Sequence, residues 1–296
     1  MTTRKTESSG KGLAIVTGAD GGMGTIHTKT LLEAGYDVIM ACYDTAVALP
    51  VFEQMDALNS RNVYLMQVDL GDLHSVKRFA DEVKSQFNSI RIILNNAGVL
   101  CHYAKRSVDG YEYTVAVNYL GHYVLNMLLH PLMGKGTRIV SMVSLSYRWF
   151  GLKPGFMQLK TARSFNRFIA YSNSKRALYY FTLKAAEQWK DEGICINVAD
   201  PGIVNTGIIC QGNKVIDFLC NKLFRPLINT PVQGAATMLE AALNPAFDGV
   251  TGCYFKKKTI AKQSRRFTGN VKEQSLLAEE TEKALKEKDF LNLRQQ

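Results

Sequence analysis

Short apolar runs alternate with longer amphipathic stretches along most of this chain. Each run ends at or near a polar residue, as Val63–Val68 ends at Asp69. The stretches between the runs carry apolar residues three and four positions apart, the period of a helix, most clearly in Leu73–Phe87. The runs cover residues 13–16, 38–42, 63–68, 90–94, 138–143 and 194–199, with a seventh at 252–255. This alternation predicts an α/β protein with a doubly wound parallel sheet of about seven strands and helices on both faces.

One domain with two polar ends is expected. Residues 1–11 predict a flexible N-terminal arm, residues 12–258 hold the sheet and its helices, and residues 259–296 predict a charged tail, either a peripheral helix or a mobile segment. The sequence shows no internal repeat. The helices are expected at Met23–Glu33, Val47–Leu58, Leu73–Phe87, Tyr111–Leu132 and Tyr171–Lys190.

Composition narrows the class of protein. With 46% hydrophobic and 21% charged residues among 296, the chain resembles an ordinary soluble globular protein. No run approaches the ~18 apolar residues of a membrane helix, and residues 1–11 lack the apolar centre of a signal peptide. A cytoplasmic protein without a membrane span is therefore expected. Six scattered cysteines without a Cys-x-x-Cys pair indicate buried thiols in a reducing compartment, and five histidines without ligand spacing predict no metal site.

The formal net charge of +10 raises the question of nucleic acid or an anionic surface. Much of the excess lies near the C-terminus, at Lys256, Lys257, Lys258, Lys262, Arg265 and Arg266. Few aromatic residues stand between these cations, and no nucleic-acid motif accompanies them. A solvated face, or attraction of an anionic cofactor, is favoured over nucleic-acid binding.

A glycine-rich turn, Thr17-Gly-Ala-Asp-Gly-Gly-Met-Gly24, joins the first predicted strand to the first predicted helix. Gly18, Gly22 and Gly24 lack Cβ atoms, so the backbone can turn tightly and approach a ligand. The N–H groups at the start of a helix favour a pyrophosphate at this place. The turn therefore predicts a dinucleotide site.

Further motifs follow the glycine turn in a specific order: Asn-Asn-Ala-Gly at 95–98, Asn118, Ser144, Tyr-x-x-x-Lys at 171–175 and Pro-Gly at 201–202. From about Lys11 to Phe255 the chain resembles the short-chain dehydrogenase/reductases. Asp109–Glu112, Val117–His122 and the long gap before Tyr171 are most similar to the retinol dehydrogenase branch. The resemblance implies a Rossmann-type fold, a nicotinamide cofactor and a homo-oligomer.

Tyr171 and Lys175 are four positions apart and share one face of a helix. A tyrosine of pKa about 10 must lose roughly 3 units to act as a base near neutral pH, and a nearby ammonium shifts it in that direction. The resemblance implies that Tyr171 is the general acid/base, Ser144 holds the substrate oxygen, Lys175 bonds the nicotinamide ribose, and Asn118 anchors a proton relay.

The resemblance also implies which residues contact the cofactor. Besides Tyr171 and Lys175, these are Gly18, Asp20, Gly22, Met23, Gly24, Tyr43, Asp44, Asp69, Leu70, Asn95, Ala97, Gly98, Pro201, Gly202, Val204 and Thr206.

Three positions depart from the family pattern. Val143 replaces the first of two serines, which leaves Ser144. Asp200 precedes Pro201 where an uncharged residue or histidine is usual, and it either lies near the nicotinamide amide or faces solvent. Asp20 stands where asparagine is frequent, and it either repels a phosphate or caps the following helix.

Cofactor preference depends on the end of the second strand. NAD enzymes usually place an acid there, where this chain has Cys42, and NADP enzymes often place an arginine next, where it has Tyr43. The missing acid favours NADP, while Asp44, close enough to reach a ribose, keeps NAD open.

Apolar residues follow both Ser144 and Pro201. The first segment contains Trp149, Phe150, Phe156, Met157, Phe165 and Phe168, and the second contains Ile208, Ile209, Val215, Ile216, Phe218, Leu219, Leu223 and Phe224. They predict a hydrophobic pocket with a mobile lid for a bulky steroid-, retinoid- or lipid-like alcohol or ketone. Core packing or an oligomer contact is the alternative for these residues. The alternative function is a non-catalytic NAD(P)H-binding regulatory protein.

Overall fold

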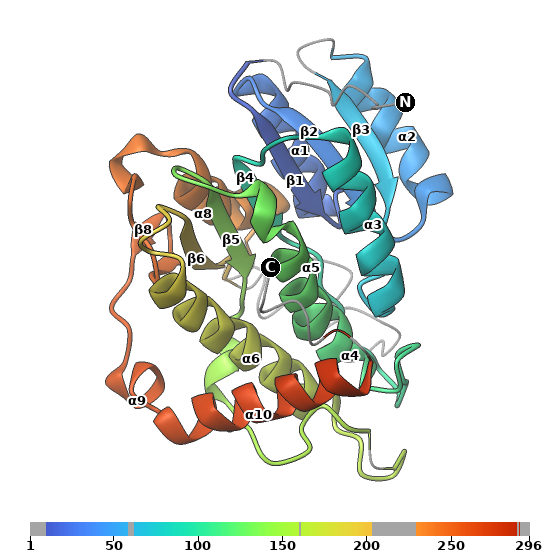
Figure 1. Ribbon diagram of the computed structural model, residues 1–296, viewed down its shortest axis with the longest axis vertical. Coiled ribbons are helices and arrows are strands. Elements are labelled where there is room, and N and C mark those ends of the chain that lie inside the picture. The colour runs from blue at the N-terminus through green and yellow to red at the C-terminus, as the bar shows by residue number, and fades with distance from the viewer. Residues whose placement is uncertain (1–9, 59–61, 160, 203–228, 289, 291–296) are drawn as a thin grey trace.

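One eight-stranded sheet runs through the computed structural model, which describes residues 10–58, 62–159, 161–202, 229–288 and 290 (Figure 1). Its strand order is β3-β2-β1-β4-β5-β6-β7-β8, and every neighbouring pair is parallel except β7 with β8. The strands are β1 (Leu13–Thr17), β2 (Asp37–Cys42), β3 (Val63–Gln67), β4 (Ile92–Asn95), β5 (Arg138–Met142), β6 (Cys195–Asp200), β7 (Tyr254–Lys256) and β8 (Thr259–Ile260). The predicted doubly wound sheet is confirmed. The eighth strand escaped prediction because its two residues are exposed and show no apolar pattern.

Helices cover both faces of the sheet (Figure 1). The described helices are α1 (Gly22–Glu33), α2 (Thr45–Asp56), α3 (Leu73–Gln86), α4 (Tyr113–Val115), α5 (Gly121–Leu129), α6 (Arg167–Gln188), α8 (Pro231–Leu243), α9 (Arg265–Thr268) and α10 (Val271–Glu287). The shorter turns are η1 (Ala116–Leu120), η2 (His130–Leu132), η3 (Leu145–Arg148) and η5 (Pro245–Phe247).

Alternation along the strands divides the core in two. Leu13 and Ile15 of β1 pack with α3, α5, α6 and α10, whereas Ala14 and Val16 pack with α1, α2 and α8. Successive side chains of a strand point to opposite faces. Because both faces are covered by helices, the strands at the centre of the sheet are buried and largely apolar, most clearly β1.

Two predicted helices differ from the observed ones. Helix α2 begins at Thr45 because the Asp44 carboxylate accepts hydrogen bonds from Ala46 N (2.9 Å) and Val47 N (3.2 Å), and Pro50 lies inside the helix rather than before it. The predicted helix over Tyr111–Leu132 is divided by the π-helical turn η1, which contains Asn118. Such π turns occur frequently at functional sites.

The charged C-terminal segment is packed onto the domain. Helix α10 crosses α6 (Figure 1), and Leu277 and Leu285 belong to the same core as β1. Glu273 forms an ion pair with Arg176 of α6 at 2.7 Å, and the Tyr119 and Thr281 hydroxyls are 2.7 Å apart. The domain therefore extends beyond residue 258. Of the expected N-terminal arm, residues 1–9 lie outside the described residues.

Candidate active site

The glycine turn between β1 and α1 brings the backbone into a close cradle. Gly18 has φ +60°, and a Cβ on Gly24 would lie 2.0 Å from Gly18 O. Any larger residue at position 24 would push α1 away from the turn. Helix α1 has Gly21 as its N-cap and no side-chain cap bond, so Asp20 does not cap it. The N–H groups of its first turn are oriented for an anion such as a pyrophosphate.

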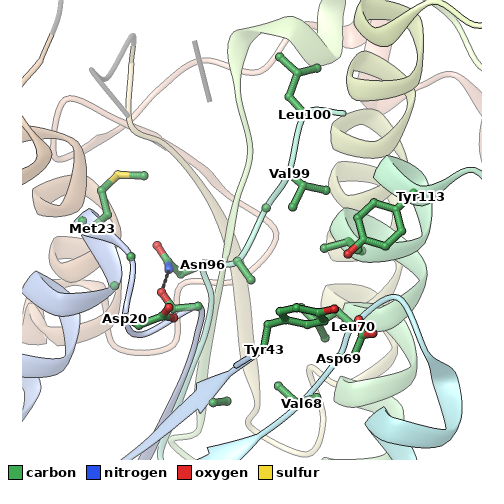
Figure 2. A pocket seen from close by; sticks show the side chains of 18 residues that line it. Asp20, Met23, Tyr43, Val68, Asp69, Leu70, Asn96, Val99, Leu100 and Tyr113 are labelled. Carbon is green, nitrogen blue, oxygen red and sulfur yellow. Dashed lines mark hydrogen bonds between the residues drawn. The ribbon is translucent and has the colours of Figure 1, made fainter. Parts of the chain in front are cut away.

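A cavity of about 550 Å³ opens beyond the carboxyl ends of the first four strands (Figure 2). Its walls are Gly18, Asp20, Gly21, Gly22, Met23, Gly24, Ala41, Tyr43, Val68, Asp69, Leu70, Asn96, Ala97, Gly98, Val99, Leu100, Tyr113 and Val117. Most of the residues predicted to contact the cofactor line this cavity. Its place in the sheet and its glycine cradle fit a dinucleotide.

Two predicted cofactor residues are engaged elsewhere. The Asp44 carboxylate caps α2. The Asn95 side chain is fully buried, donates to Ser141 Oγ at 3.0 Å and accepts from Asn126 Nδ2 at 3.2 Å. Its neighbour Asn96 lines the cavity instead and donates to Thr17 O at 2.8 Å, which fixes the glycine turn.

The predicted residues after β6 are described only in part. Pro201 and Gly202 follow β6 and do not line the cavity. Val204, Thr206 and the apolar segment predicted as a lid, from Ile208 to Phe224, lie outside the described residues.

The four predicted catalytic residues come from three elements. Tyr171 and Lys175 lie on α6, Ser144 lies between β5 and η3, and Asn118 lies in η1. A Cβ on Gly98 would lie 3.3 Å from Lys175 Nζ and 3.4 Å from Asn118 Oδ1. Lys175 and Asn118 therefore meet at the Gly98 wall of the cavity.

Hydrogen bonds fix this group. Asn118 Oδ1 accepts from Val99 N at 2.7 Å, and its Nδ2 donates to Val99 O at 2.9 Å and to Ser174 Oγ at 3.0 Å. Lys175 Nζ donates to Met142 O at 2.9 Å and lies 5.7 Å from the centre of the Tyr171 ring. The lysine thus connects strand β5 to the tyrosine.

The pKa of Tyr171 differs from the sequence expectation. Burial raises this pKa to about 12, Asp200 adds to the increase, and a hydrogen bond with Ser144 opposes it. Burial also lowers the pKa of Lys175 to about 8. The tyrosine is therefore a neutral phenol at pH 7, as a free tyrosine would be.

Asp200 neither faces solvent nor stands free beside a ligand site. It is 2% exposed, its Oδ1 accepts from Gly202 N at 2.9 Å, and its Oδ2 accepts from Tyr254 OH at 2.5 Å. Asp200 thus shapes the Pro201–Gly202 turn and links β6 to β7.

His122 is a site residue that the sequence did not single out. Its Nε2 lies 3.0 Å from Thr17 Oγ1, and its Nδ1 lies 3.2 Å from Asn118 O. Thr17 Oγ1 also accepts from Asn96 N and Ala97 N, both at 3.0 Å. One buried ring therefore connects the glycine turn to the π turn. In the sequence, His122 could have been recognised by its place four residues after Asn118, on the same face of a helix.

Within the described ranges, no group of three or more histidine, cysteine, aspartate or glutamate side chains is arranged to hold a metal ion. The four described cysteines, Cys42, Cys101, Cys195 and Cys253, are free thiols.

Comparison with known proteins agrees with this geometry. Residues 12–217 match the family model described as short chain dehydrogenase. Retinol dehydrogenase 14 of Mus musculus is 33% identical over 261 residues, which cover 81% of this chain and 76% of that protein. Polyprenol dehydrogenase of Danio rerio is 32% identical over 260 residues, which cover 84% of this chain and 78% of that protein.

Solved structures share the fold. An uncharacterized protein from Mycobacterium paratuberculosis has a TM-score of 0.72 at 24% identity, with 95% of both chains covered. A short chain dehydrogenase from Burkholderia cenocepacia, in complex with NADP, has a TM-score of 0.66 at 24% identity, with 81% of this chain and 94% of that chain covered.

The chain therefore belongs to the short-chain dehydrogenase family. Its relatives place it in the branch of the retinol dehydrogenases, as the motifs at 109–122 predicted. This membership supports a nicotinamide-dependent oxidoreductase of alcohols.

Proposed function

We propose that this protein is an NAD(P)-dependent short-chain alcohol dehydrogenase or carbonyl reductase. It interconverts a primary or secondary alcohol and its aldehyde or ketone. The observation that carries the proposal is the meeting of Lys175 and Asn118 at Gly98, on the wall of a cavity built for a dinucleotide. A protein that only senses the cofactor needs the cavity but not the catalytic group beside it.

Each part of the site has a separate task. The glycine turn and the start of α1 bind the diphosphate, and Lys175 directs its ammonium toward the Gly98 wall. A bound nicotinamide supplies hydride-transfer chemistry. Ser144 orients the substrate oxygen, and Tyr171 moves the proton to or from that oxygen.

Tyr171 donates its proton as a carbonyl is reduced and accepts one as an alcohol is oxidised, so the proposal covers both directions.

We propose a bulky hydrophobic substrate, steroid-, retinoid- or lipid-like. Trp149, Phe150 and Phe168 are 58%, 38% and 43% exposed, and they lie close in sequence to Ser144 and Tyr171. Two other members of the predicted pocket, Phe156 and Met157, are buried in the core and belong to its packing. Relatives named for retinol and polyprenol support the same substrate class.

Replacing Tyr171 by Phe tests the chemistry. We expect turnover to fall by about 10²–10⁴ because the proton donor is lost, while the affinity for NADH or NADPH stays unchanged. Turnover is measured by nicotinamide absorbance and affinity by nicotinamide fluorescence. Tyr179→Phe is the matched control, since Tyr179 lies on the same helix and its hydroxyl donates to Gln263 at 2.5 Å.

Two outcomes would contradict the proposal. Undiminished turnover in Tyr171→Phe would remove the tyrosine from the mechanism, and binding of cofactor without turnover of any carbonyl by the unaltered protein would favour the regulatory alternative. A substrate panel in which only small polar ketones react would eliminate the bulky substrate.

A further inference from the structure

Among the described residues that line the dinucleotide cavity, the charged side chains all have the same sign. These are Asp20 and Asp69, and the described lining residues include no lysine or arginine. Lys175 Nζ approaches the cavity only behind Gly98. Figure 2 shows Asp20 and Met23 on the side of the glycine turn, with Tyr43, Asp69 and Tyr113 opposite. Asp69 Oδ1 accepts from Gly71 N at 2.7 Å, so one oxygen of its carboxylate is used in the turn after β3.

The end of β2 has neither of the side chains that usually distinguish NAD from NADP. Cys42 is fully buried in the core, and Tyr43, which follows it, is 61% exposed and carries no charge. The Asp44 carboxylate accepts from Ala46 N and Val47 N at the start of α2. An acid that accepts from a ribose hydroxyl and an arginine that binds a 2′-phosphate are both missing from this strand end.

Asp20 reaches the same place from the glycine turn. Strands β1 and β2 are paired with Thr17 opposite Ala41, and Gly18 N donates to Ala41 O at 2.8 Å. The Asp20 carboxylate lies against the Cys42 thiol and contributes, after burial, to the increase of the cysteine pKa to about 12. The carboxyl end of β2, which has no acid of its own directed to the cavity, therefore has a carboxylate near it from the glycine turn.

We propose that Asp20 selects the cofactor by accepting hydrogen bonds from the adenosine ribose hydroxyls, and that the cofactor is NAD rather than NADP. This inference rests on the proposed function. A hydroxyl is a neutral donor that a carboxylate binds well. A 2′-phosphate would bring a second anion beside Asp20, where the described lining residues include no cation, and like charges at this range repel. The charges of the cavity therefore favour NAD, whereas the sequence favoured NADP because no acid stands at Cys42.

Titration with NADH and with NADPH, read by nicotinamide fluorescence at one ionic strength, tests this selection. The unaltered protein is expected to bind NADH at least about tenfold tighter, a difference of about 1.4 kcal/mol. Asp20→Asn removes the charge with almost no change of shape. We expect it to weaken NADH and strengthen NADPH until the two affinities agree within about threefold.

Asp44→Asn is the matched control, because it removes the same charge a short distance away at a residue that caps α2. Its ratio of NADH to NADPH affinity should equal that of the unaltered protein. If Asp20→Asn does not fold, as judged by thermal melting, Asp20→Ser replaces it.

The outcomes separate this inference from the proposed function. Loss of the preference in Asp44→Asn but not in Asp20→Asn would assign the selection to Asp44 and overturn the inference. Equal affinities, or a preference for NADPH, in the unaltered protein would overturn it as well and leave the proposed function intact. If neither nucleotide binds, both fail together.

Discussion

A single histidine determines how the two halves of the site are connected. The Asn118 carbonyl can only accept a hydrogen bond, so His122 Nδ1 must donate to it, and Nε2 must then accept from the Thr17 hydroxyl. Burial, with the Lys175 charge, lowers the pKa of His122 to about 3. The ring is therefore neutral at physiological pH and remains in one tautomer.

Replacing His122 by Phe should damage both cofactor binding and stability. It removes the hydrogen bond from Nδ1 to the buried Asn118 carbonyl, at about 1–3 kcal/mol, whereas the Thr17 hydroxyl can still donate to Leu94 O at 3.3 Å. We expect the free energy of unfolding to fall by that order and NADH affinity to weaken, because Thr17 Oγ1 also holds Asn96 N and Ala97 N.

His122→Gln is the comparison for this variant. A glutamine amide can both donate and accept, so part of the lost stability and affinity should return. Denaturant unfolding and fluorescence titration measure the two effects. Equal behaviour of the Phe and Gln variants would show that the hydrogen bonds are irrelevant.

Local pattern determines most elements, and contacts between distant segments determine the exceptions. Seven strands and most helices follow directly from apolar periodicity, and the predicted catalytic residues followed from motif order. Asn118 was expected on a regular helix, but its π turn depends on hydrogen bonds to Val99 and Ser174, which the periodicity does not encode. The family resemblance implied that Asn95 contacts the cofactor, but its neighbour Asn96 lines the cavity instead. Adjacent residues at a strand end face opposite sides, and the sequence alone does not say which side is open.

The hairpin between β7 and β8 is strained at two lysines. Lys257 and Lys258 have φ of +50° and +65°, a region that residues other than glycine seldom adopt. Lys258→Gly should stabilise the protein by about 0.5–1 kcal/mol. Glycine removes the steric cost of the positive φ, and this gain exceeds the additional conformational entropy that a glycine loses on folding.

Thermal melting measures this change as an increase of about 2 °C in Tm. Lys262→Gly is the control, since Lys262 is an exposed lysine nearby without a positive φ. A decrease of Tm in Lys258→Gly would show that the lysine side chain stabilises the hairpin by other contacts.

At the scale of the whole molecule, the two-sided core buries ionisable groups as well as apolar ones. No helix within the described ranges is long and apolar enough to cross a bilayer. The cytoplasmic location and the homo-oligomeric state stay predictions.

Among the buried ionisable groups, His27 and His122 are fully covered, and burial lowers the pKa of His27 to about 4.

Acid should therefore destabilise the protein well before its carboxylates titrate. Both histidines have folded pKa values below the unfolded value of about 6.5. Below that pH the unfolded chain binds more protons, so stability is full above pH 6.5 and decreases as pH falls toward 4. Each histidine contributes about 1.4 kcal/mol per pH unit, or about 2 kcal/mol between pH 6.5 and 5.

Denaturant unfolding at pH 7, 6 and 5 measures this slope. His27→Gln removes one of the two titrating groups, and the loss between pH 6.5 and 5 should shrink by about half. Constant stability over this range would show that the histidines are protonated in the folded protein.

Helix α10 finally bears on the order in which the chain folds. Its contacts join residues far apart in sequence, as Tyr119 with Thr281 across 162 positions and Tyr111 with Ala284 across 173. Contacts of such separation carry a large entropic cost of loop closure and form late, after the local strand–helix units. Until α10 docks, the apolar surface of α6 that it covers is exposed, and such surface promotes association between partly folded chains. We therefore expect the yield of refolding, as well as the finished fold, to depend on α10.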